Sequence, residues 1–423
     1  MRATFKPLRD PDFRPLVVAF CVNELGDWLG SVALAILVFD QTGSALATAG
    51  LFLATQFLPA FLAPPLVARL EILRSGRALP AVYAAEGIVF ALLALTASEF
   101  SLVAVFVLAA IDGALASAAR ALSRAMAAAM LAPRGLLREG NAILNLAFTG
   151  GAAAGPALAG IAVAIWGVQG ALLGDAASFL LVAALLVRVP ALRRASSEAA
   201  PWSERLREGL EYVRSRPVLM RLISAEAAAI AFFALIIPIE VVFAIETLGA
   251  GDAGYGALLA AWGTGMFAGA IVFTALRGLS LRALLLGSTL AIGLAYLATA
   301  AAPTLLFACA AAVVGGAGNG IQWVSLVSAV QELTADEFQA RVVSVLESAA
   351  SAAPGIGFVA GGVIAVTIGP RASFAVAGAG VLVVLAIAAV ALRNAPLAGP
   401  KPPRQIAADP ARAATSDPLH SQP

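Results

Sequence analysis

Almost all of the positive charge of this chain lies on one side of its apolar segments, and this pattern constrains the fold more than any other feature. When the segments are threaded back and forth through a bilayer, 26 of the 27 Lys and Arg residues fall on one side and only Arg371 falls on the other. Basic residues collect in cytoplasmic loops, so the pattern predicts twelve spans with both termini in the cytoplasm. The segments run over 15–39, 45–68, 80–97, 100–118, 141–165, 170–188, 220–245, 255–276, 283–301, 304–328, 342–367 and 372–392.

Composition places the chain among polytopic membrane proteins. It is 61% hydrophobic and 12% charged, with a mean hydropathy of +0.93, which is far from the range of soluble domains. A helix needs about 20 apolar residues to cross a hydrocarbon core of about 30 Å, and most segments supply that length. The short Arg-bearing loops and the net charge of +2 are no footprint for nucleic acid.

Residue types also exclude several kinds of chemistry. The two cysteines, Cys21 and Cys309, lie inside predicted spans, and the single histidine, His420, lies near the C-terminus. No Cys/His cluster and no phosphate-binding Gly-Lys loop occurs in the sequence, so we expect no metal site, no cofactor, no enzymatic activity and no use of ATP. The first apolar segment has no small-residue cleavage site, which favours a retained helix over a secretory signal.

The spans divide into two groups of six around a polar segment. We expect an N-terminal half over 1–188, a cytoplasmic linker over 189–219, a C-terminal half over 220–393 and a disordered cytoplasmic tail over 394–423. Within the linker, the charged and apolar side chains of residues 204–213 recur at helical spacing. This spacing predicts an amphipathic helix that lies on the cytoplasmic face.

The two halves show the pattern of an internal repeat. A constant offset of 202 residues relates Arg14 to Arg216, Glu24 to Glu226, Asn145 to Glu347, Gly155 to Gly357 and Gly160 to Gly362. A constant offset over several positions favours duplication of a six-helix unit.

Four short sequence segments are similar to those of a known protein family. They are NELGDW at 23–28, FDQTGS at 39–44, EGLEYV at 208–213 and RPVL at 216–219. With twelve spans and a long central loop, they resemble the major facilitator superfamily, and within it the bacterial efflux branch that includes macrolide and enterobactin exporters. The resemblance implies an all-α fold of twelve transmembrane helices in two pseudo-symmetric halves that move small molecules by alternating access.

The fifth span carries a small-residue motif made of Gly151, Gly155, Pro156 and Gly160. Glycines four residues apart let another helix approach closely, and proline removes a backbone donor and bends the helix. The motif resembles the antiporter signature of exporters in the superfamily, which implies a pliant gating helix between the halves. The alternative is ordinary packing of small residues.

The loop after the second span departs from the superfamily pattern. That pattern has a Gly, then Asp-Arg, then a further Arg, whereas this loop reads ARLEILRSGR over 68–77. The nearest acid is Glu71, followed by Arg74. The gating latch that the resemblance implies is therefore either weakened or re-routed through Glu71 and Arg74.

Acidic residues inside the spans are the strongest chemical signal, because an ionised carboxylate in hydrocarbon needs water, a partner or a proton. Glu24 and Asp27 share one face of the first span, and each raises the proton affinity of the other. They are our first candidates for proton coupling, against the alternative of a hydrogen bond that pins two helices. Asp112 and Glu226 are further candidates.

The remaining acids have structural alternatives. An ion pair between Asp112 and Arg120 would link helix ends. Glu240 follows Pro238 near the outer side and suits an external gate, whereas Glu86 and Asp175 suit helix packing.

Several polar or aromatic side chains within apolar spans are candidates for a substrate cavity. Each either contacts a ligand or bonds a neighbouring helix. A mostly apolar cavity with a few such groups suits amphipathic molecules rather than sugars or phosphates. The candidates are Gln56, Asn145, Trp262, Asn319, Gln322, Trp323 and Glu347.

These observations predict a monomeric transporter in the cytoplasmic (inner) membrane. The resemblance and the fifth-span motif imply that it exports amphipathic molecules, such as drugs or siderophore-like metabolites, in exchange for protons. Its partners are the substrate, protons and the lipid bilayer. Two alternatives stay open, an uptake permease on the same fold and a membrane sensor or assembly factor that transports nothing.

Overall fold

The protein is built from helices. The computed structural model describes residues 5–63, 66, 77–187, 202–276, 278–335 and 338–393, and no strand occurs in these ranges. In chain order the elements are η1 (Lys6–Arg9), α1 (Phe13–Thr42), α2 (Ala45–Phe52), η2 (Leu53–Phe57), α4 (Ala78–Thr96), α5 (Leu102–Leu131), η3 (Ala132–Arg134), α6 (Leu137–Leu186), α7 (Trp202–Arg214), α8 (Pro217–Ala234), η4 (Ile237–Ile239), α9 (Glu240–Val242), η5 (Phe243–Thr247), α10 (Gly251–Ala275), α11 (Leu281–Ala300), α12 (Leu305–Leu333), α13 (Gln339–Ala352), α14 (Pro354–Thr367) and α15 (Pro370–Ala391).

Eleven helical stretches among the described residues are long and apolar enough to cross a membrane. The predicted number was twelve, and the difference lies in α6. Gly167 interrupts α6 with φ 68° and ψ 171°, a backbone conformation that glycine adopts without steric cost. The segments before and after Gly167 correspond to the fifth and sixth predicted spans, so the prediction of a twelve-helix fold is confirmed.

Three other spans are continuous but irregular. The second runs from α2 into the π-helical turn η2, and the seventh runs through α8, η4, α9 and η5. The eleventh consists of α13 and α14, and α14 begins at Pro354, a residue that fits the first turn of a helix because it needs no backbone donor there. Irregular turns of this kind interrupt the hydrogen-bond ladder of a span and often mark functional positions.

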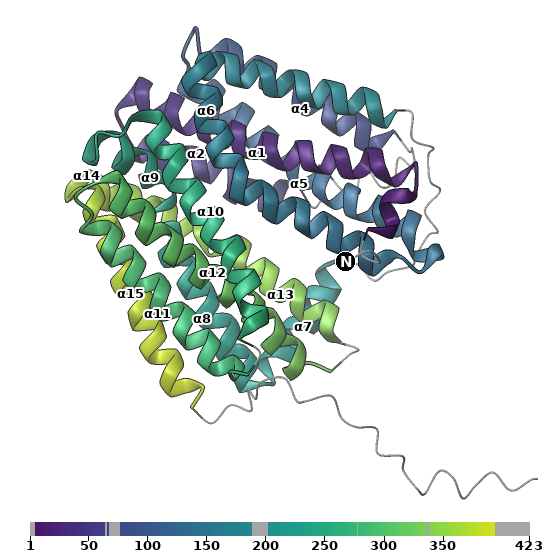
Figure 1. Ribbon diagram of the computed structural model, residues 1–423, viewed down its shortest axis with the longest axis vertical. Helices are drawn as coiled ribbons and strands as arrows, with labels where there is room; N and C mark the ends of the chain where they lie inside the picture. The colour runs from purple at the N-terminus through teal and green to yellow at the C-terminus, as the bar shows by residue number, and fades with distance from the viewer. Residues whose placement is uncertain are drawn as a thin grey trace, which may run out of the picture.

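Two helical bundles meet at one end of the molecule (Figure 1). The halves contact each other where α6 meets α10, α2 meets α14 and η4, and α1 meets α9. A continuous apolar core joins them there, since Phe358, Ile239 and Tyr255 of the C-terminal half share it with the N-terminal helices. We call this the joined end.

At the opposite end the bundles diverge, and α7 and α13 lie there on the C-terminal half (Figure 1). A separate apolar cluster, which includes Val213, Leu219 and Val342, packs these elements together. We call this the linker end, because the helix of the predicted linker lies there. The two ends therefore differ in how the halves are held together.

Arg371, the one basic residue outside the charge pattern, has a structural role. Its guanidinium donates hydrogen bonds to the carbonyl oxygens of Ala300 and Ala302 at 2.6 and 2.8 Å, at the C-terminal end of α11. A cation at this end of a helix satisfies carbonyl groups that have no partner within the helix. At the other end of the same helix pair, Arg282 donates to the carbonyl oxygen of Arg393 at 2.7 Å, so α11 and α15 cap each other.

Candidate functional site

The centre of α1 carries a buried polar face. Asn23 is fully buried and Glu24 is 3% exposed, although both lie in the middle of an apolar helix. Asp27 Oδ2 accepts a hydrogen bond from Asn23 Nδ2 at 3.1 Å and forms an ion pair with Arg120 of α5. Asp27 thus has a direct cationic partner within the N-terminal half.

Glu24 is placed differently from Asp27. One of its oxygens, Oε1, has no hydrogen-bond partner among the described residues, and its carboxyl group interacts electrostatically with Asp27, Arg120 and Arg124. Arg124 donates from two nitrogens to Asn145 Oδ1 at 3.3 Å each, which links α5 to α6. The predicted pair of acids therefore shares a site with two arginines of α5.

The expected ion pair between Asp112 and Arg120 does not form, because Arg120 is directed to Asp27 on the neighbouring helix. Asp112 is 9% exposed, and its Oδ1 lacks a hydrogen-bond partner in the described ranges. Glu86 of α4 and Asp175 of α6 are also deeply buried and interact electrostatically with Asp27. Sequence reasoning treated these two as packing residues and missed this placement. The available signal was a single acid in each of three apolar spans, in addition to the pair in the first span.

The C-terminal half contains a smaller polar contact. Gln322 Nε2 of α12 donates to Glu226 Oε2 of α8 at 2.8 Å. Gln322 is buried, Asn319 is half-buried, and Trp323 is 44% exposed on the same helix. Gln322, one of the candidate cavity residues, therefore forms a hydrogen bond to the neighbouring helix α8.

Trp262 lies in an aromatic stack. Its ring is 5.7 Å from that of Phe233 and 5.4 Å from that of Tyr296, with interplanar angles of 16° and 12°. Trp262 contributes to the packing of α8, α10 and α11 in this arrangement.

Near the joined end, the buried Glu240 interacts electrostatically with Tyr255 and Tyr296.

The glycine motif of α6 faces two helices at once. A Cβ atom added at Gly155 would lie 2.7 Å from the Cβ of Trp28, and one added at Gly151 would lie 3.0 Å from the Cβ of Glu24, so both glycines contact α1.

On the other side, a Cβ at Gly160 would lie 3.0 Å from Gly256 Cα, and a Cβ at Gly256 would lie 2.9 Å from the carbonyl oxygen of Pro156. The motif therefore lies between the acidic face of α1 and the opposite half of the molecule.

The remaining predicted residues are only partly placed. Gln56 is exposed within the π-helical turn η2. Glu347 belongs to α13, but its side chain lies outside the described part, as do both Glu71 and Arg74.

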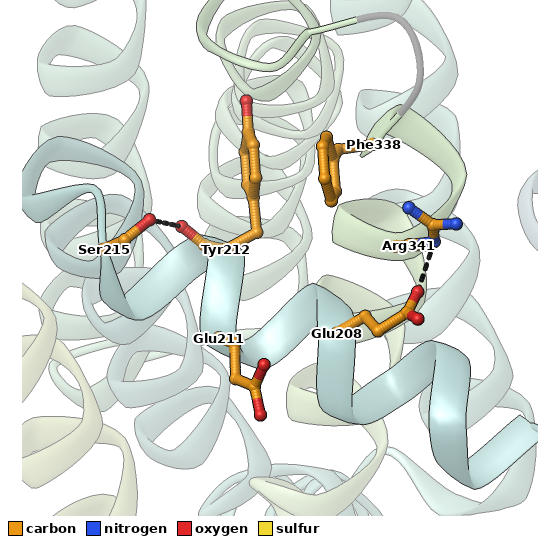
Figure 2. A pocket seen from close by; sticks show the side chains of 6 residues that line it. All are labelled: Glu208, Glu211, Tyr212, Ser215, Phe338 and Arg341. Atoms are coloured by element: carbon orange, nitrogen blue, oxygen red, sulfur yellow. Dashed lines mark hydrogen bonds and ion pairs between the residues drawn. The ribbon is translucent and has the colours of Figure 1, made fainter.

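Helix α7 docks on the C-terminal half at the linker end. Figure 2 shows Arg341 of α13 reaching Glu208 of α7, with Nε and Oε2 separated by 2.9 Å. The Tyr212 and Phe338 rings stack with centroids 4.3 Å apart, and the Tyr212 hydroxyl accepts a hydrogen bond from the backbone N–H of Ala335 at 3.0 Å.

These residues, with Glu211 and Ser215, line an open hollow of about 410 Å³. The hollow is formed by the linker helix and α13 and is separate from the Asp27–Arg120 pair of the other half. It offers no enclosure for a substrate.

Comparison with known proteins connects this architecture to transport. The model of the MFS_3 family, described as transmembrane secretion effector, matches residues 2–409. No curated protein matches the chain significantly.

Several solved transporter structures share the fold. The nucleoside transporter NupG has 12% identity and a TM-score of 0.71, over 91% of this chain and 100% of that one. A bacterial homologue of the human lysosomal transporter Spinster, in an inward-facing and occupied conformation, has 14% identity and a TM-score of 0.72 over 92% and 97%. A D-xylose–proton symporter has 15% identity and a TM-score of 0.63 over 88% and 95%. At these identities the likeness shows the fold alone.

Proposed function

Because the chain belongs to the MFS_3 family of transmembrane secretion effectors, a family of major facilitator transporters, we propose that it exports amphipathic small molecules in exchange for protons. Transport of small molecules across a membrane is the function that the family and the fold support. The direction, the coupling ion and the substrate class are our proposal. We further propose that it works as a monomer without a cofactor or enzymatic step.

The observation that carries proton coupling is the ion pair between Asp27 and Arg120. It links α1 to α5 inside an apolar bundle, where a carboxylate is stable only while a cation or a proton neutralises it. Protonation of Asp27 would cancel its charge and release Arg120, so the two states of the pair differ in helix contacts as well as in charge. Such a pair can couple loading of a proton to a rearrangement of helices.

The position of the α6 motif supports a link between this pair and gating. Gly151 and Gly155 contact α1 next to Glu24 and Trp28, and Gly160 contacts α10 of the other half. A change in α1 can therefore reach the interface of the halves through one helix. In this proposal the motif is the pliant element about which the halves rock.

For orientation we propose that the linker end is cytoplasmic and that both termini lie on that side. The one-sided distribution of basic residues supports this orientation, in the cytoplasmic (inner) membrane of a bacterium. The halves are joined at the opposite end, so the structure then corresponds to an inward-facing state. A cysteine introduced at Ala253, which is exposed near the joined end, should react with a membrane-impermeant reagent in intact cells, whereas one at Ser197 should not.

The proposed cavity combines exposed Gln56 and Trp323 with half-buried Asn319. A cavity with few polar groups among apolar side chains suits amphipathic substrates, which have a polar part and an apolar part. Two other functions stay as alternatives, uptake on the same fold and sensing without turnover. Accumulation in intact cells distinguishes uptake from export, and binding without turnover in proteoliposomes identifies a sensor.

The central test uses the purified full-length protein in proteoliposomes with an imposed pH gradient and ethidium as an amphipathic probe. We expect ethidium to move against its gradient only when protons flow the other way. Asp27→Asn should abolish this dependence, because an amide keeps the hydrogen-bonding shape but cannot change its charge. Asp40→Asn is the matched control, since Asp40 is exposed near the end of the same helix. An unchanged pH dependence in Asp27→Asn would overturn the proposed coupling site.

A further inference from the structure

Three carboxyl groups of α4, α5 and α6 lie in the interior of the N-terminal half in addition to Glu24 and Asp27 of α1. Glu86 of α4 is fully buried, Asp175 of α6 is 1% exposed and Asp112 of α5 is 9% exposed. Both oxygens of Glu86, Oδ1 of Asp112 and Oδ2 of Asp175 have no hydrogen-bond partner in the part of the chain that the structure describes. Side chains this deeply buried and this poorly satisfied need an explanation.

The three groups converge on the same place from three helices. Glu86 interacts electrostatically with Asp27, Asp112, Arg120 and Asp175, and Asp112 interacts with Asp27, Asp175 and Arg120. Asp175 lies against α1 at Gly26, the residue before Asp27, because a Cβ added at Gly26 would be 2.5 Å from Asp175 Oδ1, and Asp175 interacts electrostatically with Asp27. The cluster is therefore gathered around the acid that forms the ion pair.

Charge balance limits the state of these acids. Arg120 is the basic residue of the described part that interacts with Glu86 and Asp112, and its positive charge is already paired with Asp27 and also faces Glu24. The neighbouring hydroxyl groups of Tyr83 and Ser123, which lie 3.4 Å apart, are neutral. A buried carboxylate without a counter-charge costs several kcal/mol and becomes neutral instead.

The described residues contain no group of three or more Asp, Glu, His or Cys side chains that could hold a metal ion. A proton on each carboxyl group neutralises Glu86, Asp112 and Asp175 without a further ligand.

From these contacts we infer that Glu86, Asp112 and Asp175 form an enclosed proton-holding site next to the Asp27–Arg120 pair. Resting on the proposed proton coupling, this site exchanges protons with Asp27 during transport. One proton leaves a carboxyl O–H of the site and binds the Asp27 carboxylate, and the acid left ionised becomes the counter-charge of Arg120. The net charge of the interior is unchanged by the exchange, which avoids the cost of an unbalanced charge in the bundle.

The experiment measures protonated carboxyl groups directly, by the infrared C=O stretching band of the purified full-length protein at neutral pH. Exposed carboxyl groups are ionised there, since their ordinary pKa is about 4, so the band reports enclosed acids. We expect Glu86→Gln, Asp112→Asn and Asp175→Asn each to remove the contribution of one carboxyl group. Glu99→Gln, at an exposed position, is the control that should leave the band unchanged.

Asp27→Asn gives a signature that a purely structural role would not produce. Asp27→Asn is made in a Glu24→Gln background, which also removes the other α1 acid that interacts with Arg120. With both α1 acids neutral, Arg120 needs another counter-charge, so one acid of the site should ionise. The band should then be one carboxyl group smaller than in Glu24→Gln alone, although none of the three was replaced. A wild-type band that none of the three substitutions changes, or the absence of a band, would overturn the site. Proton-independent transport with the expected band would reject the proposed coupling and keep the proton-holding site.

Discussion

The two halves make the same helix contact with different chemistry. In the N-terminal half, α1 and α5 are linked by the ion pair of Asp27 and Arg120, whereas in the C-terminal half α8 and α12 are linked by the hydrogen bond of Glu226 and Gln322. Gln322 follows Arg120 by the repeat offset of 202 residues, and Glu226 follows Glu24 by the same offset. One structural position therefore holds a charge in one half and a neutral amide in the other.

Packing is conserved across the halves where charge is not. A Cβ added at Gly155 would meet Trp28 of α1, and one added at Gly357 would meet the carbonyl oxygen of Ala231 on α8, the equivalent helix. Gly160 and Gly362 likewise each contact a helix of the opposite half. In contrast, the positions equivalent to Glu86 and Asp175 are Ser288 and Ala377. The comparison indicates that both halves share the packing frame, whereas the acids of α4 and α6 around Asp27 have no acidic counterpart in the C-terminal half.

The largest expected effect comes from making the N-terminal half resemble the C-terminal half. Arg120→Gln removes the counter-charge of Asp27, and breaking a buried ion pair from one side costs about 3–5 kcal/mol. For Arg120→Gln we expect a loss of stability at or below the lower limit of this range, since the Arg120 side chain is 35% exposed. We expect loss of proton-driven ethidium transport together with a lower melting temperature in detergent.

Glu226→Gln is the matched variant in the other half. It removes one hydrogen-bond acceptor oxygen without leaving a buried charge, so the cost is about 1 kcal/mol. Transport should retain its dependence on the pH gradient. Equal loss of coupling in both variants would show that the halves share the proton chemistry and would break the comparison.

The second expected effect tests the symmetric packing. Gly160→Leu and Gly362→Leu each place a large side chain where a helix of the other half lies, at Gly256 and at Leu46 respectively. We expect both to reduce transport to a similar extent, because each separates the halves at the joined end. Gly150→Ala is the control on α6, since no atom lies within 4 Å of an added Cβ there.

Folded, membrane-inserted protein in these variants is checked by size-exclusion profile before transport is compared. Full activity in both leucine variants would leave the glycine motif with a packing role only. Loss in Gly160→Leu alone would mean that gating, like charge, belongs mainly to the N-terminal half.

The third expected effect concerns stability at the joined end. Arg371→Ala removes two charge-assisted hydrogen bonds to the end of α11, and bonds of this kind contribute about 1.5–3 kcal/mol. The melting temperature should fall while transport at low temperature persists. Arg371→Lys should recover only part of the loss, because an ammonium group lacks the fork that reaches two carbonyl oxygens.

The sequence predicted the fold well because its signals are periodic and additive. Span length, basic loops and the repeat offset each sum over many residues, so no single position decides the result. The break in α6 was placed correctly between predicted spans because Gly167 lies in that gap, although its positive φ could not be inferred from an apolar stretch.

The site was predicted only in part. Glu24 and Asp27 were singled out as candidates because acids are rare in apolar spans, but the ion pair of Asp27 with Arg120 was not predicted. Arg120 lies 93 residues from Asp27, and the pairing depends on how α1 and α5 face each other. The convergence of Glu86 and Asp175 on Asp27 depends on the same long-range packing, which no local pattern in either helix encodes.

The smallest expected effect concerns the linker helix, which is attached to the C-terminal half and so extends the comparison beyond the bundles. Arg341→Ala removes the ion pair with Glu208, whose side chain is 39% exposed, and pairs of this exposure contribute about 0–1 kcal/mol. The stack of Tyr212 on Phe338 keeps α7 docked, so stability should barely change.

Any effect of Arg341→Ala should instead appear as faster proteolysis of the segment around α7, with Arg207→Ala as the control. Arg207 pairs with Glu211 within α7 itself at 3.9 Å and does not reach α13, so its loss leaves docking intact. A large loss of transport in Arg341→Ala without such cleavage would mean that the linker contact transmits movement between the halves. The C-terminal half would then contribute to the transport cycle through α7 as well as through its frame.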